Sequence, residues 1–341
     1  MMLPVVVVQV LLGLWLCITL GAATSTTSTS TMTGTTGTSS SSSSTTTTSS
    51  TPTSSSTTTA TTTSTFELLP GWATVSKGAA HSCALDHGTR TAKCWGDGAH
   101  GQLGHGLVSS SPEPVAVEGT SEVVAISAGG LHACTVEISG EVKCWGDGRY
   151  GQLGHGGLGT RLVARPVPAL EVALDVSAGG SHTCALEQNG TVKCWGWNEF
   201  GQLGHGSPES SRYPRLVVGL SDVIAISAGA LHTCAVERGG VVKCWGFGTH
   251  GQLAHGTKED RRFSPGPIVP GVVGAEDVAC GHMHSCARLI DATVRCWGQG
   301  IDDQLQAENY SLIWEKTTRL DMTLQEAVDT TFWTSPLGSA W

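Results

Sequence analysis

The stretch HACTVEISGEVKCWGDGRYGQLGHG, residues 132–156, decides the fold, because its pattern returns along most of the chain. The pattern is His-x-Cys, nine or ten residues, Cys-Trp-Gly, four variable residues and then Gly-Gln-Leu-Gly-His-Gly, which is complete in the first three copies. Successive Cys-Trp-Gly tripeptides are 50, 50, 50 and 52 residues apart, which indicates one folding unit copied along the chain. They begin at Cys94, Cys144, Cys194, Cys244 and Cys296.

Each copy has the composition of short β-strands. In the second copy, the segments 123–126, 132–136 and 141–145 are separated by Gly and polar residues, and no helical period extends beyond two turns. This pattern predicts an all-β repeat.

The cysteine spacing predicts the register of a hairpin in each copy. If Cys134 and Cys144 lie directly opposite each other, His132 faces Gly146, and the large ring lies beside an absent side chain. A spacing of ten leaves an odd loop, which a three-residue turn with a left-handed Gly fits. The first copy has a spacing of eleven, so residues 87–90 form a loop of four. The required glycines are Gly140, Gly190 and Gly240.

Facing cysteines on neighbouring strands are within reach of a disulfide bond, and secreted chains favour oxidised thiols. A zinc site is the alternative, since His-x-Cys and the facing Cys offer three ligands, but no fourth ligand recurs. We therefore expect disulfides and neither a metal nor a cofactor. The expected bridges are Cys83–Cys94, Cys134–Cys144, Cys184–Cys194, Cys234–Cys244 and Cys286–Cys296.

Two of the twelve cysteines lie outside these hairpins. Cys17 falls in the apolar N-terminal segment, and Cys280 takes the position that Ala128, Ala178 and Ala228 hold in other copies. A small buried thiol is favoured at Cys280, with an intermolecular bridge as the alternative.

The N-terminus predicts export. Residues 5–20 form an apolar run of 16, short for a bilayer span, and Gly21-Ala22-Ala23 suits signal-peptidase cleavage. We expect residues 1–23 to be a signal peptide and the protein to be secreted or held at the cell surface, with no stable membrane span after cleavage. Because no Lys or Arg precedes Lys77, an uncleaved segment that tethers the chain to the membrane is the alternative.

Residues 24–65 are almost entirely Ser and Thr, without a charged residue. Such a segment has too little apolar surface to offset its chain entropy, so we expect it to be disordered. An O-glycosylated stalk and a plain flexible spacer are both compatible with this composition.

The net charge of −9 belongs entirely to the chain from Glu67 onward. Nucleic-acid binding requires clustered Lys and Arg, so a nucleic-acid partner is not expected. The basic residue before each Cys-Trp-Gly is interpreted as a solvated stem. These residues are Lys93, Lys143, Lys193, Lys243 and Arg295.

The four residues after each Cys-Trp-Gly differ between copies, so they are free to carry specificity. Corresponding loops of a repeat lie on one face, and these residues suit a protein hot spot or a sugar. The alternative is that the rings pack between neighbouring loops. The recurrent tryptophans 95, 145, 195, 245 and 297 are interpreted as core wedges. The candidate contacts are His100, Arg149, Tyr150, Trp197, Phe200, Phe247 and His250.

No catalytic site is expected. The repeated Gly-x-Gly-x-x-Gly lacks the following helix that a dinucleotide site needs. No Asp, Ser or Cys recurs beside the histidines of the Gly-rich loops as a triad partner. Two sequons, at Asn189 and Asn309, are candidate glycosylation sites, and Asn189 falls at an expected hairpin tip. The loop histidines are His105, His155, His205 and His255.

The combination of His-x-Cys, Val-Lys-Cys-Trp-Gly and Gly-Gln-Leu-Gly-His-Gly resembles the repeat of the regulator of chromosome condensation family, a β-propeller with blades of about 50 residues. The likeness runs from about Trp72 to Leu305 and departs at Ala254 and at residues 303–306. The resemblance implies a propeller over residues 66–320, with five recognisable blades where members usually have seven. The tail, residues 321–341, is a candidate closing strand, and the sequence leaves the closure open.

Members of the family include a chromatin-bound guanine-nucleotide exchange factor, propellers attached to ubiquitin ligases and secreted protein-binding propellers. The expected export, the acidic domain and the lack of an insertion that could serve as an exchange wedge argue against the exchange activity here. We therefore expect an extracellular, non-catalytic propeller that binds a protein or a glycan. The alternatives are an exchange factor or a ubiquitin-ligase-associated propeller, as in intracellular members, and a structural surface-coat protein.

Overall fold

The computed structural model describes residues 72–86, 88–256, 262–299 and 314–316. The expected signal peptide, the Ser/Thr-rich segment, the tail and Asn309 lie outside the described residues. Within the described part, every regular element is a β-strand, and no helix is long and apolar enough to cross a membrane.

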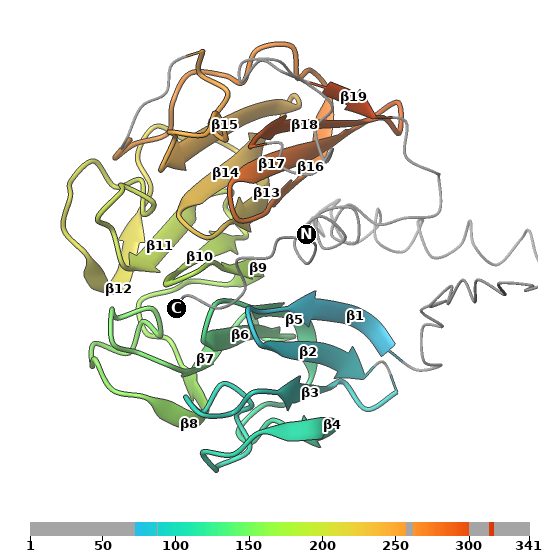
Figure 1. Cartoon of the computed structure of the whole chain (residues 1–341), viewed down its shortest axis with the longest axis vertical. Helices are drawn as coiled ribbons and strands as arrows, with labels where there is room; N and C mark the ends of the chain where they lie inside the picture. The colour runs from blue at the N-terminus through green and yellow to red at the C-terminus, as the bar shows by residue number, and fades with distance from the viewer. Residues whose placement is uncertain (1–71, 87, 257–261, 300–313, 317–341) are drawn as a thin grey trace, which may run out of the picture. The chain divides into compact units, whose positions relative to one another are not determined.

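The strands form five antiparallel sheets, one for each copy of the repeat, which we call blades 1 to 5 (Figure 1). Blade 1 contains β1 (Trp72–Lys77), β2 (His81–Asp86), β3 (Thr91–Gly96) and β4 (Ser111–Ala116). Blade 2 contains β5 (Val123–Ala128), β6 (His132–Glu137), β7 (Val142–Gly146) and β8 (Arg161–Pro166). Blade 3 contains β9 (Ala173–Ala178), β10 (His182–Glu187), β11 (Val192–Gly196) and β12 (Ser211–Leu216). Blade 4 contains β13 (Val223–Ala228), β14 (His232–Glu237) and β15 (Val241–Gly246). Blade 5 contains β16 (Ala275–Cys280), β17 (His284–Leu289), β18 (Val294–Gly298) and β19 (Trp314–Lys316).

Within each blade the strands pair in chain order, so that sequence neighbours are also sheet neighbours. In blade 4, bridges from Lys243 to Ile268 and from Gly246 to Arg262 lie where other blades have their fourth strand. The all-β prediction and the assignment of one blade to each copy are confirmed.

The predicted hairpin register is confirmed in all five blades. In blade 2, Cys134 lies opposite Cys144 and His132 lies opposite Gly146, and the same positions pair in the other blades. The three-residue turn of blade 2 ends in Gly140, whose φ is 81°. In blade 5, Ala292 takes this place with a φ of 63°.

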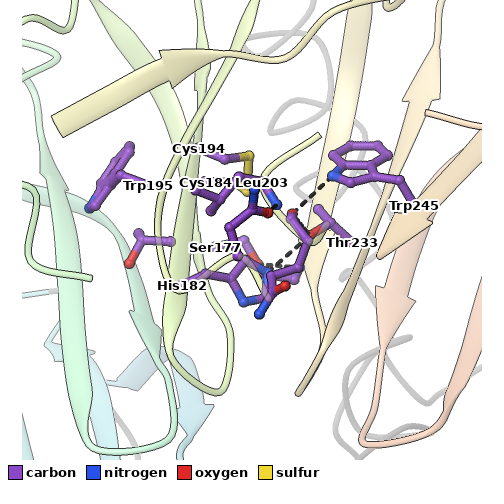
Figure 2. The surroundings of a disulfide bond; sticks show 12 residues. Ser177, His182, Cys184, Cys194, Trp195, Leu203, Thr233 and Trp245 are labelled. Atoms are coloured by element: carbon purple, nitrogen blue, oxygen red, sulfur yellow. Dashed lines mark hydrogen bonds between the residues drawn. A yellow bond between two sulfur atoms is a disulfide. The ribbon is translucent and has the colours of Figure 1, made fainter. Parts of the chain in front are cut away.

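A disulfide joins each facing pair, so the five expected bridges are all present. Figure 2 shows the bridge between Cys184 and Cys194, whose side chains are buried. Each bridge closes a loop of about eleven residues, which stabilises the folded chain by about 3 kcal/mol in the chain-entropy model. Cys280 is a free, buried thiol.

Recurrent side chains join each blade to the next. Trp195 Nε1 and Thr183 Oγ1 of blade 3 both donate to the carbonyl oxygen of Gln152 in blade 2, at 2.8 Å each. The amide of Ala178 donates to Ser127 Oγ of blade 2 at 2.9 Å. Because apolar residues of two blades pack around each such tryptophan, these tryptophans are core wedges, as expected; Trp95 of blade 1 is only half-buried. The fully buried tryptophans are Trp145, Trp195, Trp245 and Trp297.

His132 pairs with Gly146 as expected, but the expectation that its ring fills the space of the missing glycine side chain is wrong. A Cβ at Gly146, whose φ is 97°, would come within 2.6 Å of the carbonyl oxygen of Leu131, so backbone fills that space. The ring of His132 lies instead against Gly129, where a Cβ would come within 2.6 Å of Cε1.

The interpretation of the basic residues as solvated stems is also wrong. Lys143 Nζ lies 2.7 Å from Glu137 Oε1 and donates to the carbonyl oxygen of Gly119 at 2.9 Å, and its side chain is only 13% exposed. Glu137 in turn accepts the amide of Ser121 at 2.8 Å. A lysine is held this way because a buried carboxylate needs a partner. Lys193 and Lys243 repeat the arrangement, Lys93 pairs with Asp86, and Arg295 donates to the carbonyl oxygen of Gly271.

Candidate functional site

The loops that follow β7, β11 and β15 carry most of the candidate contacts. Each loop begins after the strand-ending Gly of Cys-Trp-Gly and ends at Gly-Gln-Leu, whose Gln side chain is buried. In blade 2 the Oε1 atom of Gln152 accepts the amide of Tyr150 at 2.9 Å. The recurrent Gln therefore positions the fourth variable residue of each loop. The corresponding bonds join His100 to Gln102, Phe200 to Gln202 and His250 to Gln252.

The first variable residue decides whether the loop is polar or aromatic. Burial alone would raise the pKa of Asp97, but the amide of Ala99, the hydroxyl of Ser110 and the amide of Gln102 donate to it and lower its pKa. In blade 2 the equivalent carboxylate, that of Asp147, accepts a hydrogen bond from Arg149 Nε at 3.0 Å. In blades 3 and 4, aromatic residues stand at this position. In blade 3, Asn198 takes over the polar role by donating to the carbonyl oxygens of the following loop.

Five of the predicted contacts form a continuous row of rings, which we call the aromatic row. Centroid distances along it are 5.5 Å for Tyr150 to Trp197, 5.4 Å for Trp197 to Phe200, 4.9 Å for Phe200 to Phe247 and 5.8 Å for Phe247 to His250. The row thus spans loops of blades 2, 3 and 4. Tyr150 is 46% exposed, and the other four side chains are half-buried.

The two interpretations of these rings are therefore not exclusive. The rings pack between neighbouring loops, as the alternative held, and they also present a continuous part-exposed surface. Arg149 lies at the Tyr150 end of the row and is held by Asp147. Among the described residues, His100 makes no ring contact with the row, so the structure does not join it to this group.

The sequence reasoning missed His282 of blade 5. Burial lowers the pKa of His282, and the charge of His250 at the end of the row lowers it further, so the two histidines interact electrostatically. His282 stands where the other copies have Gly130, Gly180 or Ala230. Comparison of the copies at this position could have identified it.

Other candidates have local roles. Asn189 is exposed in the turn between β10 and β11, as expected, and its Oδ1 accepts the amide of Thr191 at 2.9 Å. Two histidines of the Gly-rich loops close their own loops: Nε2 of His105 lies 3.1 Å from Ser109 Oγ, and Nε2 of His205 lies 3.1 Å from the carbonyl oxygen of Glu209.

One group of possible metal ligands lies between blades 4 and 5. Donor atoms of His232, Cys234 and Cys280 lie within 4.8 Å of one another. Cys234 is bridged to Cys244, however, and a bridged sulfur is not a thiolate ligand. With the bridge intact, the group offers two ligands, too few for a structural zinc site.

Comparison with known proteins identifies the fold and the family. A segment of 67 residues is 37% identical to the human RCC1 domain-containing protein 1, and it covers 19% of this chain and 18% of that protein. The chain thus matches less than a fifth of the length of this curated relative. The structure of human WBSCR16 superimposes with a TM-score of 0.66 and 23% identity, over 72% of this chain and 67% of that one.

Yeast RCC1 (Prp20), in a structure that shows Kap60 bound to it, gives a TM-score of 0.58 with 22% identity, over 67% and 56% of the two chains. A second structure of Prp20p from Saccharomyces cerevisiae, described with its binding to Gsp1p and histones, gives 0.56 with 22% identity, over 63% and 55%. The family model of the RCC1-like domain matches residues 8–332, so the chain belongs to the RCC1-like domain family.

Proposed function

We propose that this chain is an extracellular, non-catalytic binding module that engages a protein partner through the aromatic row. The row itself carries the proposal. Tyr, Trp and other large aromatic side chains dominate protein hot spots when they are held rigidly and are partly accessible. Ring contacts hold these side chains, as do the hydrogen bonds from the loop amides to Gln152 and Gln202, and no carboxylate belongs to the row.

Ring geometry favours a protein over a glycan. The planes of Trp197 and Phe200 are inclined at 84°, and those of Phe200 and Phe247 at 65°. Sugars stack on flat ring faces, whereas edge-to-face rings offer the uneven apolar surface that side chains fill. Protein binding also agrees with the Prp20 structures, of which one has Kap60 bound and the other is described with binding to Gsp1p and histones.

The five disulfides support an extracellular location. Bridges of this kind persist in oxidising compartments and are rare in the cytosol. The apolar segment 5–20 and the small residues after it support export in the same direction. The Ser/Thr-rich segment would then be a stalk, and Asn189 would be accessible to glycosylation.

Location is tested by expressing the full chain in a eukaryotic secretory host. We expect the protein in the medium, without residues 1–23, with ten cysteines in disulfides and one unmodified thiol. Retention in the cytosol with reduced cysteines would contradict the proposal.

Binding is tested with a displayed peptide library selected on the wild-type protein. Selected peptides should bind the Trp197→Ala and Phe200→Ala variants about 30-fold more weakly, as expected for a hot spot. Tyr213→Ala is the matched control, since this exposed ring lies on β12 outside the row. Unfolding curves show that each variant folds.

Two further arms address the alternatives. A glycan array on which binding depends on Trp197 would show that the row binds sugars. Release of guanine nucleotide from a small GTPase by the purified protein would favour an exchange factor. Equal binding of every peptide to wild type and Trp197→Ala, with no binding in the other arms, would favour a structural coat protein.

A further inference from the structure

An uncompensated pair of arginines lies on the outer strand of blade 2. In blades 1 to 4, the lysine before Cys-Trp-Gly pairs with a carboxylate, and so do Arg149 and Arg288. Arg161 and Arg165 of β8 form no ion pair with a described carboxylate. Glu118 packs nearby, over Gly106, but it pairs with neither arginine. A local excess of positive charge therefore exists on an acidic protein.

Both arginines line one surface depression. Its volume is about 660 Å³, and His155 lies in its wall. Burial lowers the pKa of His155, the carbonyl oxygen of Arg165 partly offsets this by accepting Nε2 at 2.9 Å, and the charges of both arginines lower the pKa further. The charges that act on the imidazole of His155 are thus those of two guanidinium groups, and no carboxylate balances them. The lining residues are His155, Thr160, Arg161, Leu162, Val163, Arg165 and Pro166.

A glycine-rich loop makes room for one of these guanidinium groups. Arg161 Nη1 donates to the carbonyl oxygen of Thr160 at 3.1 Å. A Cβ added at Gly157 or Gly159 would lie 3.3 Å from a guanidinium nitrogen of Arg161. The guanidinium group of Arg161 therefore lies close to the backbone of the loop, at positions where the two glycines have no side chain. Arg161 stays half-buried, and Arg165 is exposed.

Blade 2 differs from its neighbours at these positions. Blade 1 has Ser111 and Val115 in place of the two arginines. Blade 3 has a serine in place of Arg161, keeps Arg215 in place of Arg165, carries Arg212 at the position of Leu162, and adds Glu209 where blade 2 has Gly159. A hydrogen bond with the Ser207 hydroxyl is the main cause that lowers the pKa of Glu209, and the charge of Arg215 also lowers it. Arg215 of blade 3 therefore has a counter-charge nearby. Arginines at both of these positions, without the glutamate of blade 3, are thus a property of blade 2 and not of the repeat.

We propose that this surface of blade 2 binds the sulfate groups of an acidic polysaccharide. Guanidinium groups recognise oxyanions through paired N–H donors, and the two arginines are about 13 Å apart along an extended strand. A peptide is disfavoured because the outer edge of β8 is already paired: Leu162 accepts the amide of Gly106, and Ala164 donates to Glu118, both at 3.0 Å. Strand addition is therefore blocked, and side chains alone are left to make contact.

The choice of a polysaccharide rests on the extracellular location proposed above. It does not rest on the aromatic row, because β8 and the loops that carry the row contribute different residues. The two proposals can therefore fail separately. Trp197→Ala should leave polysaccharide binding unchanged.

The test is calorimetric titration of the full secreted chain with a heparin-derived dodecasaccharide at several salt concentrations. We expect saturable binding that weakens with salt. The double variant Arg161→Ser/Arg165→Val carries the residues of blade 1 and should bind at least about tenfold more weakly, with a salt slope smaller by about two. Arg90→Ser/Arg238→Ser removes the same charge from exposed hairpin turns and should bind as wild type does.

A second variant keeps both arginines. Gly159→Glu introduces the residue of blade 3 beside Arg161 and should abolish binding by supplying an internal counter-charge. In the wild type, the oligosaccharide should raise the pKa of His155 in an NMR titration, and a merely structural role of the arginines would not produce this shift.

Three outcomes would overturn the proposal. Binding of polyglutamate with equal affinity and equal dependence on Arg161 would show recognition of any anion. Binding that survives in the double variant would place the site elsewhere. Loss of solubility in the double variant, without oligosaccharide binding in the wild type, would show that the two arginines only keep the protein soluble.

Discussion

The imidazole of His182 and the hydroxyl of Thr233 belong to successive blades, and Nε2 lies 2.9 Å from Oγ1 (Figure 2). Thr233 Oγ1 donates its hydrogen to the carbonyl oxygen of Gln202 at 2.9 Å. The hydroxyl therefore accepts from the ring, which places a proton on Nε2, and the buried Nδ1 has no acceptor among the described residues, so the imidazole is neutral. The same arrangement joins His132 to Thr183 and His232 to Ser285.

The interface between blades 1 and 2 lacks this bond, because Ala133 stands where the later blades have Thr or Ser. His81 is buried, and neither of its ring nitrogens has a hydrogen-bond partner among the described residues. Ala133→Ser should therefore raise the free energy of unfolding by about 0.5–1.5 kcal/mol, measured in urea. Thr183→Ala, which removes the bonds to His132 and to the carbonyl oxygen of Gln152, should lower it by about 1–3 kcal/mol. A destabilised Ala133→Ser protein would show that the space beside His81 cannot take a hydroxyl.

The buried histidines also make stability depend on pH. Burial is the main cause that lowers the pKa of His132, His182 and His232 to about 3. The unfolded chain takes up these protons near pH 6.5, whereas the folded chain does so only near pH 3. Stability is therefore complete above pH 6.5 and falls as the pH drops from 6.5 towards 3, by about 1.4 kcal/mol per histidine for each unit.

Urea midpoints at pH 7.0 and 4.5 measure this loss. His182→Gln should be less stable at pH 7.0 because it disturbs the bond to Thr233, but its stability should change less between the two values. A wild-type midpoint that stays constant over this range would contradict the assignment of neutral, buried rings.

The hairpins could be predicted from the sequence because their constraints are local. A bridged pair such as Cys134 and Cys144 sets the register of every position between them, and the spacing then sets the loop length. The lysines could not be interpreted correctly in this way. Whether Lys143 is solvated depends on the position of the Glu137 carboxylate. That carboxylate is held by the amide of Ser121, 16 residues earlier in the chain.

The binding surface could be predicted only as a set of positions. Copy-to-copy variation identified Trp197 and Phe247, but their connection through Phe200 depends on the distance between blades. Sequence spacing within one copy contains no information about that distance. The arginines of β8 were missed for a related reason, since net charge averages over the whole domain while Arg161 and Arg165 concentrate charge in one blade.

Each hairpin bridge should contribute separately to stability. Replacing Cys184 and Cys194 together by Ala removes a crosslink over about eleven residues, and it should lower the free energy of unfolding by about 3 kcal/mol. Both sulfurs are fully buried, so the cavity adds to the loss. The double variant should still contain four bridges by mass, which separates this effect from general misoxidation. An unchanged urea midpoint would mean that the hairpin register is held without the crosslink.

Cys280 should make the fold sensitive to alkali. Burial raises the pKa of this thiol to about 12, although hydrogen bonds with Ser285 and Ser227 partly oppose the shift. The unfolded chain loses the proton near pH 9, so stability declines as the pH rises from about 9 to 12. Cys280→Ala, which restores the alanine of the other copies, should remove this part of the decline.

The same variant tests exchange with the neighbouring bridge. The sulfurs of Cys280 and Cys234 lie within 4.8 Å of each other. Once ionised, Cys280 can attack Cys234 and form a new bridge, while Cys244 leaves as a thiolate and takes up the proton, without any oxidant. Peptide mapping after incubation at pH 10.5 should find a Cys234–Cys280 bridge in the wild type and an intact Cys234–Cys244 bridge in Cys280→Ala. Equal alkaline instability of the two proteins, with no rearranged bridge in the wild type, would show that the thiol has no part in it.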